Sequence, residues 1–314
     1  MKIADVERYL TDYSRISSWN RIKFEKLRVV LTHMRKEGIE CILLKGADVV
    51  PRLYGVLGLR AVGDVDMMVH ESDLPALDHL LTRLGYRPQI DGNPAYVDPS
   101  SILALDIVTN VWYVLDQTVI WQRAVQRDFA GLSIKGLGTN DLLLYLTAYN
   151  VVHRGYLSTA FARDVAFLAQ TEVIDWDVVV DEARRCHLKI PIYHGLSFVS
   201  TRWPGVRIPE DVLRRLAPAT VIEQVCALVF DKLVTDERVA ELGHLLLFVT
   251  RPGRKKWRWL GEAFFPSAAF LKYRYADQWE AHSLLTRLSR PLHLLSQAGR
   301  LAVRVLRVLI TARA

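Results

Sequence analysis

The spacing of apolar residues predicts one long helix followed by short buried strands. Between residues 4 and 37, apolar side chains recur three or four positions apart, the period of one face of an α-helix. The segments ECILL at 40–44 and DVDMMV at 64–69 are short and apolar, which is typical of buried strands. The segment ILALDIVT at 102–109 predicts a third strand.

The segments between these strands carry helix and turn signals. Residues 47–55 predict one or two helical turns, and the glycines that follow mark a loop before residue 64. Ser72 is expected to cap a helix that runs to about Leu84, and Gly85 suits the end of that helix. The order strand, helix, strand, helix, strand predicts an α/β (α+β) core with a small mixed sheet.

Strand signals almost disappear after Gly138, which predicts a mostly helical C-terminal domain. Helical patterns cover the segments 139–152, 160–170, 176–187, 190–200, 209–216, 219–235 and 237–249. The resulting prediction divides the chain into N-terminal helices at 1–38, the α/β core at 39–137, a helical domain at 138–250 and a basic amphipathic tail at 251–314.

Composition excludes several classes of protein. With 314 residues, of which 51% are hydrophobic and 24% charged, the chain has the proportions of a globular protein of about two domains. Three widely separated cysteines exclude a disulfide scaffold or a CxxC zinc site and suggest reduced thiols in the cytoplasm. The first residues lack the apolar run of a signal peptide, and no apolar stretch reaches the ~20 residues of a membrane span.

The net charge of +7 is concentrated in the tail. Residues 251–314 hold thirteen Lys and Arg against three acidic residues, and residues 251–259 interleave five basic residues with two Trp. Arg300, Arg304 and Arg307 form one helical stripe beside apolar positions. Two interpretations of this pattern stay open. The helix packs on the protein's own core with its arginines in solvent, or it lies on an anionic membrane surface, which would make the protein peripheral at the inner membrane face. Nucleic acid is an unlikely partner because no nucleic-acid module is recognisable.

Acidic residues in two of the predicted strands are the first sign of chemistry. Asp64 and Asp66 lie two positions apart on one strand, so both carboxylates project to the same side. Two like charges so close require a cation between them, and hard carboxylate oxygens suit Mg²⁺. Asp106 interrupts an apolar run, and three carboxylates converge if its strand lies beside the first. Such a cluster can hold two metal ions for phosphoryl transfer.

Four further residues are candidates for nucleotide contacts. Lys45 and Gly46 end the first predicted strand, where a lysine can neutralise a phosphate and a glycine lets backbone N–H groups approach one. Arg60 is a second candidate for clamping a phosphate, and His153 is a candidate contact to a base or phosphate. Each residue taken singly has an ordinary structural interpretation, such as a surface charge, an ion pair or a packed interface histidine. Their order along the chain is what favours a single site.

The segment LLKGADVVPRLYGVLGLRAVGDVDMMV at residues 43–69, with the later strand aspartate, resembles the polymerase-β-type nucleotidyltransferase superfamily. More narrowly, the pattern LLKG…Y…LR..GDVD is similar to the bacterial family of uncharacterised nucleotidyltransferases. The resemblance covers most of residues 10–290 and is strongest at 41–69.

The resemblance implies both a reaction and a ligand set. It implies attack of an acceptor hydroxyl on the α-phosphate of a nucleoside triphosphate, with release of pyrophosphate. Asp64 and Asp66 would bind two Mg²⁺ ions, for which Mn²⁺ can substitute, and Asp106 would bind the catalytic one. The acceptor would be a sugar, a lipid-linked molecule or a peptide. Two alternatives stay open, a non-catalytic nucleotide-binding scaffold and transfer of another group, such as a sugar from a nucleotide-diphosphate donor.

Overall fold

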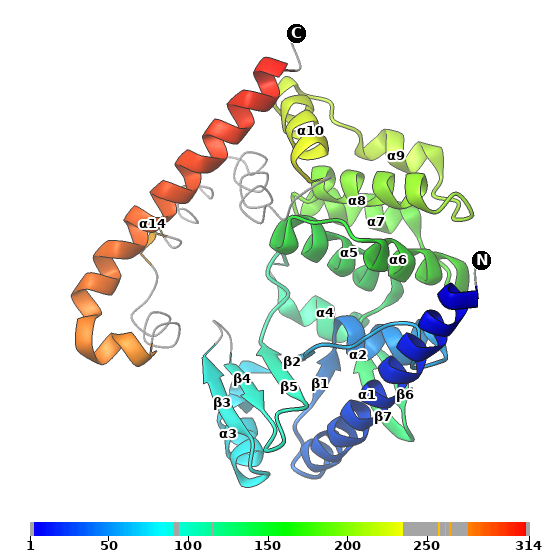
Figure 1. The fold of residues 1–314 in the computed structure, drawn as a ribbon, viewed down its shortest axis with the longest axis vertical. Coiled ribbons are helices and arrows are strands. Elements are labelled where there is room, and N and C mark those ends of the chain that lie inside the picture. Colours follow the sequence, from blue (N-terminus) through cyan, green and yellow to red (C-terminus); the bar gives the residue numbers. More distant parts are fainter. Residues whose placement is uncertain are drawn as a thin grey trace. The chain divides into compact units, whose positions relative to one another are not determined.

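The structure is a computed structural model that describes residues 3–90, 94–114, 116–234, 257, 261, 264–265 and 276–311. The chain divides into two compact units, Met1–Gly138 and Thr139–Ala314. The first unit contains a β-sheet, and the described part of the second contains helices without strands (Figure 1). The predicted division into four segments is finer than these two units and stays a prediction.

The first unit is built on a mixed sheet of seven strands. The strands are β1 (Cys41–Leu43), β2 (Val65–Val69), β3 (Arg87–Ile90), β4 (Pro94–Val97), β5 (Ala104–Val108), β6 (Val125–Phe129) and β7 (Leu132–Gly136). Their order in the sheet is β3-β4-β5-β2-β1-β7-β6. The pairs β2–β5 and β1–β7 are parallel and the other pairs are antiparallel. The predicted α/β core with a mixed sheet is therefore confirmed, with four strands that the sequence pattern did not reveal.

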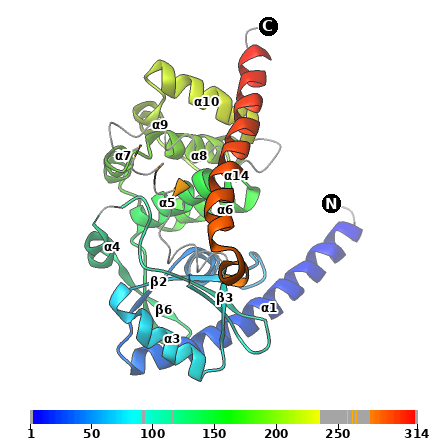
Figure 2. The same ribbon diagram turned by 90° about the vertical axis from the view of Figure 1, so that its left-hand side faces the viewer.

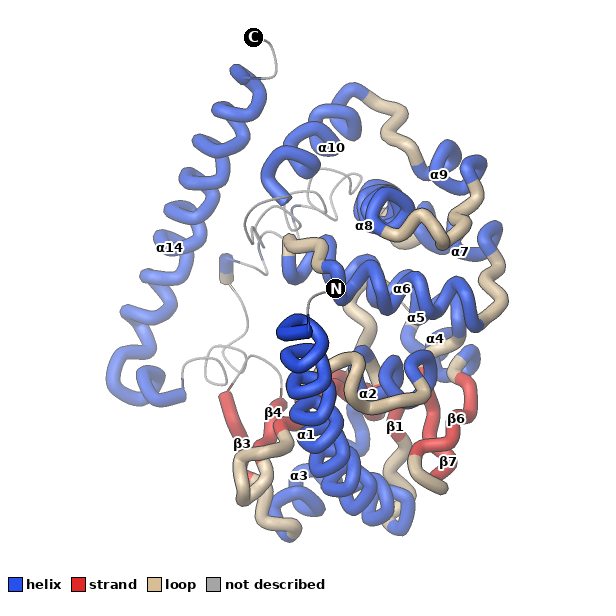
Figure 3. Tube along the Cα trace, turned by 45° about the vertical axis from the view of Figure 1, so that its right-hand side comes forward, coloured by secondary structure: helices blue, strands red, loops and turns tan. Residues whose placement is uncertain are grey.

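Two helices of this unit cover one face of the sheet. The helical elements are α1 (Ile3–Lys36), α2 (Lys45–Val49), the π-helical turn η1 (Val50–Tyr54), the 3₁₀ turn η2 (Glu71–Asp73), α3 (Leu74–Arg83) and α4 (Gln117–Arg123). Figure 3 shows α1 crossing in front of the strands. The main core joins α1 and α3 to alternate strand residues, among them Leu27, Leu31, Leu77, Leu81, Val65, Met67, Leu105 and Ile107. The opposite face of β2 and β5 is thereby left for other side chains.

The predicted cap at Ser72 is wrong. Ser72 lies inside η2, where its hydroxyl donates to a carboxylate oxygen of Asp73 at 3.2 Å, and α3 begins at Leu74. Pro75 occupies the first turn of α3, a position that favours proline because the missing N–H has no helical partner there. The predicted end of this helix is correct, since Gly85 adopts the left-handed φ of +81°.

The second unit is a helical assembly, drawn in green to red in Figure 2. Its elements are α5 (Thr139–Ala148), the π-helical turn η3 (Tyr149–Arg154), α6 (Thr159–Thr171), α7 (Trp176–Arg185), α8 (Lys189–Arg202), α9 (Glu210–Leu216), α10 (Val221–Val234) and α14 (Ala276–Thr311). Helices α5 and α8 contact each other, and both contact α6 and α7. The helices predicted up to residue 235 are confirmed, and the one predicted at 237–249 lies outside the described residues.

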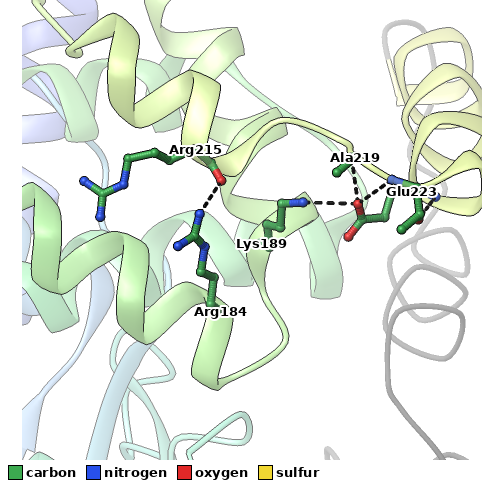
Figure 4. A network of polar contacts seen from close by, with 6 residues as sticks. Arg184, Lys189, Arg215, Ala219 and Glu223 are labelled. Carbon is green, nitrogen blue, oxygen red and sulfur yellow. Dashed lines mark hydrogen bonds and ion pairs between the residues drawn. The ribbon is translucent and has the colours of Figure 1, made fainter.

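Polar contacts join α7 to α9 and α8 to α10 (Figure 4). Arg184 donates to the carbonyl oxygen of Arg215 at 2.9 Å, and Lys189 on α8 donates to the carboxylate of Glu223 on α10 at 3.1 Å. The same carboxylate accepts from the backbone N–H of Ala219 at 2.8 Å. Burial alone would raise the pKa of Glu223, but these hydrogen bonds lower it below its usual value. The ionised carboxylate therefore fixes the start of α10 against α8.

Candidate metal centre

Three carboxylates converge at the centre of the sheet in the first unit. Strands β2 and β5 are adjacent and parallel, and their register places Asp66 directly beside Asp106. Asp64 comes one residue before β2 and two before Asp66. One carboxylate oxygen from each of the three lies within 4.8 Å of the others. Asp64 is exposed, Asp66 is buried and Asp106 is half-buried, so the cluster opens toward solvent on one side.

The alternation of residues along the two strands produces this arrangement. Side chains of successive strand residues point to opposite faces of a sheet. The residues on either side of Asp66 and Asp106 are apolar and belong to the core under α1 and α3, namely Val65, Met67, Leu105 and Ile107. Burying these neighbours turns both aspartates to the other face. Since the strands are parallel and in register, the two carboxylates become neighbours.

The three carboxylates repel one another. Burial and, after it, the nearby charges of Asp66 and Asp64 together raise the pKa of Asp106 to about 7, with Lys45 acting against them. A carboxylate in this position resists ionisation until a cation is added. Three hard oxygen donors within 4.8 Å of one another are the donor set that Mg²⁺ prefers, so these residues fit the metal that the sequence implied.

Lys45 reaches the cluster from the neighbouring strand. It follows β1, which pairs with β2, and it begins α2. Its φ is +47°, the left-handed region that non-glycine residues rarely occupy and that concentrates at functional sites. Its ammonium group forms an ion pair with the carboxylate of Asp66, and its side chain is only 15% exposed. The expected position of Lys45 beside the carboxylates is therefore what the structure has.

Gly46 and Arg60 lie against each other. A Cβ atom added at Gly46 would come 2.7 Å from the Nη1 atom of Arg60, closer than any side chain permits. The glycine therefore lets the guanidinium group lie against the backbone immediately after Lys45. Arg60 belongs to the loop that leads into β2, so a cation of this loop lies beside the start of α2.

Two residues of α1 that the sequence analysis did not identify hold this loop. Asn20 is 1% exposed, and its amide nitrogen donates to the carbonyl oxygens of Leu57 and Arg60, each at 2.7 Å. Its amide oxygen accepts from the backbone N–H of Val62 at 3.0 Å, and Lys23 donates to the carbonyl oxygen of Val62 at 2.6 Å. The sequence offered one signal for Asn20: it is a polar residue placed three or four positions from apolar residues of α1, on the side of the helix that packs.

His153 belongs to the second unit. It lies at the end of η3, and its ring is 5.6 Å from the ring of Tyr149 with the two planes 23° apart. The guanidinium carbon of Arg154 is 5.7 Å from the centre of the same tyrosine ring. His153 is thus part of an aromatic and cationic stack within its own unit. Its contact with a nucleotide stays a prediction.

Removing one charge from the carboxylate cluster should stabilise the metal-free protein. Because the pKa of Asp106 is raised in the folded state to about 7, the wild type loses stability as the pH rises from about 4 through 7. We expect Asp106→Asn to unfold with a free energy about 1 kcal/mol higher at pH 7.5, a modest value because solvent screens this half-buried group. Thermal denaturation in EDTA measures it.

The dependence of this stability difference on pH and on Mg²⁺ shows whether the charge of Asp106 causes it. The advantage of Asp106→Asn should vanish below about pH 3, where the wild-type carboxyl is protonated in both states. Saturating Mg²⁺ should reverse the order, because only the wild type keeps all three carboxylates. A variant less stable than the wild type at pH 7.5 without metal would contradict this account.

A carboxylate cluster on two parallel strands of a mixed sheet defines a candidate site for metal-dependent phosphoryl transfer. The chain belongs to the family of uncharacterised nucleotidyltransferases, whose profile matches residues 3–204. The resemblance seen in the sequence is therefore confirmed. A search of curated proteins finds none that matches this chain.

Two solved structures are similar in fold. The antibiotic-resistance factor ANT(2'')-Ia, studied in solution, is 11% identical; the match covers 59% of this chain and 95% of that one, with a TM-score of 0.40. An antigenic nucleotidyltransferase-like protein from Paracoccidioides brasiliensis is 14% identical; that match covers 63% of this chain and 92% of the other, with a TM-score of 0.43.

Proposed function

We propose that the protein transfers a nucleoside monophosphate from a nucleoside triphosphate to a hydroxyl group of an acceptor. The acceptor oxygen forms a bond to the α-phosphorus, the bond from that phosphorus to the bridging oxygen breaks, pyrophosphate leaves, and the hydroxyl proton is released to solvent. The observation that carries this proposal is the carboxylate triad of Asp64, Asp66 and Asp106 in a chain that belongs to a nucleotidyltransferase family.

The residues of the first unit have separate roles in this proposal. Asp64, Asp66 and Asp106 would hold Mg²⁺, which would neutralise the charge that develops on the phosphate oxygens. Lys45 forms an ion pair with Asp66. From this position beside the cluster its ammonium group would also contact the triphosphate. Arg60 is proposed as the second phosphate contact, held beside Gly46 by its loop.

The products separate this function from the two alternatives. Full-length protein with Mg²⁺ and each of the four nucleoside triphosphates should bind one of them in a metal-dependent manner, measured by calorimetry with non-hydrolysable analogues. Turnover should then release pyrophosphate. Release of a nucleoside diphosphate from a nucleotide sugar would instead show glycosyl transfer. Metal-dependent binding without turnover of any candidate acceptor would favour the scaffold, and no binding at all would contradict a nucleotide site.

We also propose that α14 docks on an anionic membrane surface. No helix in the described part of the chain has the length and apolar character needed to cross a membrane. Five large apolar residues of α14 are nevertheless 50% to 68% exposed, and their spacing of three, eight, three and four places them on one stripe: Leu292, Leu295, Val303, Leu306 and Ile310. Leu301 is buried, so the stripe is distinct from the side of α14 that packs.

The charges beside that stripe favour lipid over another apolar partner. Arg300, Arg304 and Arg307 are exposed and flank it, and the sequence from residue 281 onward contains no Asp or Glu. An apolar stripe edged by arginines is typical of a helix that lies in a membrane interface. Each arginine near an anionic bilayer adds about 1 kcal/mol of attraction. The three together therefore predict a binding preference of about a hundredfold for anionic over neutral vesicles.

A charge placed in the stripe should remove vesicle binding. We expect full-length Leu306→Glu to sediment with phosphatidylglycerol-containing vesicles at least about tenfold less than the wild type, because it buries a carboxylate against lipid of the same sign. The matched control is Val173→Glu, which adds the same charge at a position that is 93% exposed and outside α14. Equal binding to neutral and anionic vesicles, or an equal loss in both variants, would contradict the proposal.

A further inference from the structure

The helical unit contains a cavity of its own. It has a volume of about 460 Å³ and is lined by residues from three places: the connection before α6, helix α8, and helix α10. The size lies within the usual range for small-molecule sites. The ion pair between Lys189 and Glu223 joins α8 to α10 in this same unit, so two of its walls are fixed to each other.

One face of α8 supplies most of the polar lining. His194, Ser197, Thr201 and Arg202 border the cavity at helical spacing, together with Phe198. The remaining face of α8 is apolar and buried, with Ile190, Ile192, Leu196 and Val199 in the core. Ser197 is half-buried and Thr201 and Arg202 are exposed, so the polar stripe is accessible from solvent. Its hydroxyl and guanidinium groups are therefore able to contact a polar molecule in the cavity.

His194 is an unusual residue to find beside a cavity. It is 3% exposed, and its Nδ1 atom lies 3.1 Å from the carboxylate of Asp231. In that contact Nδ1 donates and the carboxylate accepts. The Nε2 atom is buried and has no hydrogen-bond partner among the described residues. A buried polar atom left in this state is destabilising, and a ligand hydroxyl, which can donate or accept, would satisfy it.

The charged residues that line this cavity do not favour the binding of a nucleotide in it. Among the described residues the lining holds one carboxylate, Asp231, and one guanidinium group, Arg202. The guanidinium carbon of Arg202 lies 5.5 Å from the ring centre of Phe198. Such a lining has no excess of positive charge for a triphosphate. Aromatic walls at Phe198 and Phe230 with hydroxyl and imidazole groups between them suit an uncharged molecule that carries several hydroxyls.

We infer that this cavity binds an uncharged, hydroxyl-bearing small molecule of monosaccharide size. A ligand hydroxyl pairs with Nε2 of His194, Ser197 and Thr201 contact further hydroxyls, and the ring of Phe230, 4.4 Å from the ring of His194, forms an apolar wall.

Saturation-transfer NMR on the full chain tests the inference with D-glucose, N-acetyl-D-glucosamine and myo-inositol as probes and D-glucose 6-phosphate as a charged comparison. At least one of the three uncharged polyols should bind and the sugar phosphate should not. Ser197→Trp, which fills the cavity from its partly exposed side, should abolish binding, and His194→Phe should weaken it about tenfold. Thr201→Val should weaken it by a smaller factor.

Thr171→Val is the matched control for Thr201→Val. Both threonines donate to the carbonyl oxygen four residues earlier near the end of a helix, at 2.8 Å for Thr171 and 2.9 Å for Thr201, but only Thr201 borders the cavity. Polyol binding that is unchanged in Ser197→Trp, or no polyol binding by a wild type that binds Mg²⁺ and nucleotide, would overturn the inference alone. Polyol binding without any nucleotide binding would leave the cavity assigned and contradict the proposed function.

Discussion

Asp66→Asn is expected to lower nucleotidyl transfer at least about a thousandfold, which corresponds to about 4 kcal/mol of transition-state stabilisation. Asp66 is the most buried of the three carboxylates and lies between Asp106 on β5 and the ammonium group of Lys45. An amide in its place keeps the shape of the side chain but supplies no negative charge to a divalent cation. Lys45 also loses its ionic partner, so the cation and the phosphate contact are both disturbed.

The measurement needs no knowledge of the acceptor. Calorimetric titration of Mg²⁺ with a non-hydrolysable nucleoside triphosphate should show binding by the wild type and none by Asp66→Asn. Asp128→Asn is the matched control, because Asp128 lies on strand β6 of the same sheet and is exposed. We expect it to bind within twofold of the wild type. Equal affinity in Asp66→Asn and the wild type would remove the carboxylate triad from the proposed function.

The central strands of the sheet were predictable from the sequence. β1 and β2 are buried on both faces and read as short apolar runs, and in β5 buried residues alternate with half-buried ones. Asp64 and Asp66 on one strand fixed two carboxylates on a common face, and Asp106 in an apolar run indicated a neighbouring strand. Parallel pairing of β2 with β5 then brings all three together. Lys45 was predictable for a similar reason, since it ends the strand on the other side of β2.

The outer strands carried no comparable signal. β3 and β4 contain Pro88 and Pro94, and β6 carries three consecutive residues with amide or charged side chains, Gln126, Arg127 and Asp128. Strands toward the edges of a sheet tolerate such residues because one side faces solvent, so the apolar pattern that marks a central strand is weak there. Their pairing as hairpins is decided by tertiary packing, which a local pattern does not contain.

The contacts that hold the loop before β2 also could not be predicted from a local sequence pattern. Asn20 and its carbonyl partners Leu57 and Arg60 are about forty residues apart in the sequence. The left-handed φ of Lys45 is likewise imposed by its surroundings, since nothing in the residue itself favours it. Sequence reasoning therefore located the three carboxylates that cluster and the lysine beside them. It did not locate the groups that position them.

Asp98→Asn is expected to destabilise the first unit by about 3 kcal/mol, the largest effect on stability that we predict. Asp98 is 1% exposed and accepts hydrogen bonds from the backbone N–H groups of Ile102 at 2.6 Å and Leu103 at 2.7 Å. The Nζ atom of Lys26 on α1 lies 2.7 Å from its other carboxylate oxygen, which also accepts from Ser100. One side chain thus closes the turn between β4 and β5 and ties it to α1.

An asparagine cannot serve all of these donors. Its amide nitrogen must face at least one N–H or ammonium group, so a buried donor loses its partner and the attraction to Lys26 is lost. Since β5 carries Asp106, loosening this turn should also weaken metal binding, although Asp98 is not one of the three clustered carboxylates. Urea denaturation of the full chain, followed by circular dichroism, measures the change in the free energy of unfolding.

The pH dependence separates this ionic contribution from a general loss of packing. Burial acts to raise the pKa of Asp98, but hydrogen bonds from Lys26, Ser100 and the turn hold it well below its usual range. A carboxyl whose pKa is lowered by folding contributes stability that is present above about pH 4 and is lost as the pH falls through the folded value. The difference between wild type and Asp98→Asn should therefore be full at pH 7 and shrink below pH 4.

Asp116→Asn is the matched control for the destabilisation expected in Asp98→Asn. Asp116 also accepts a backbone hydrogen bond, from Thr118 at 3.0 Å, but it is exposed and caps only α4. Loss of an exposed cap of this kind should destabilise the protein far less than the loss of the buried carboxylate at Asp98. Equal losses in the two variants would mean that the buried network at Asp98 adds nothing to an ordinary turn. A loss at Asp98 that does not change between pH 7 and pH 3 would assign the effect to packing and not to charge.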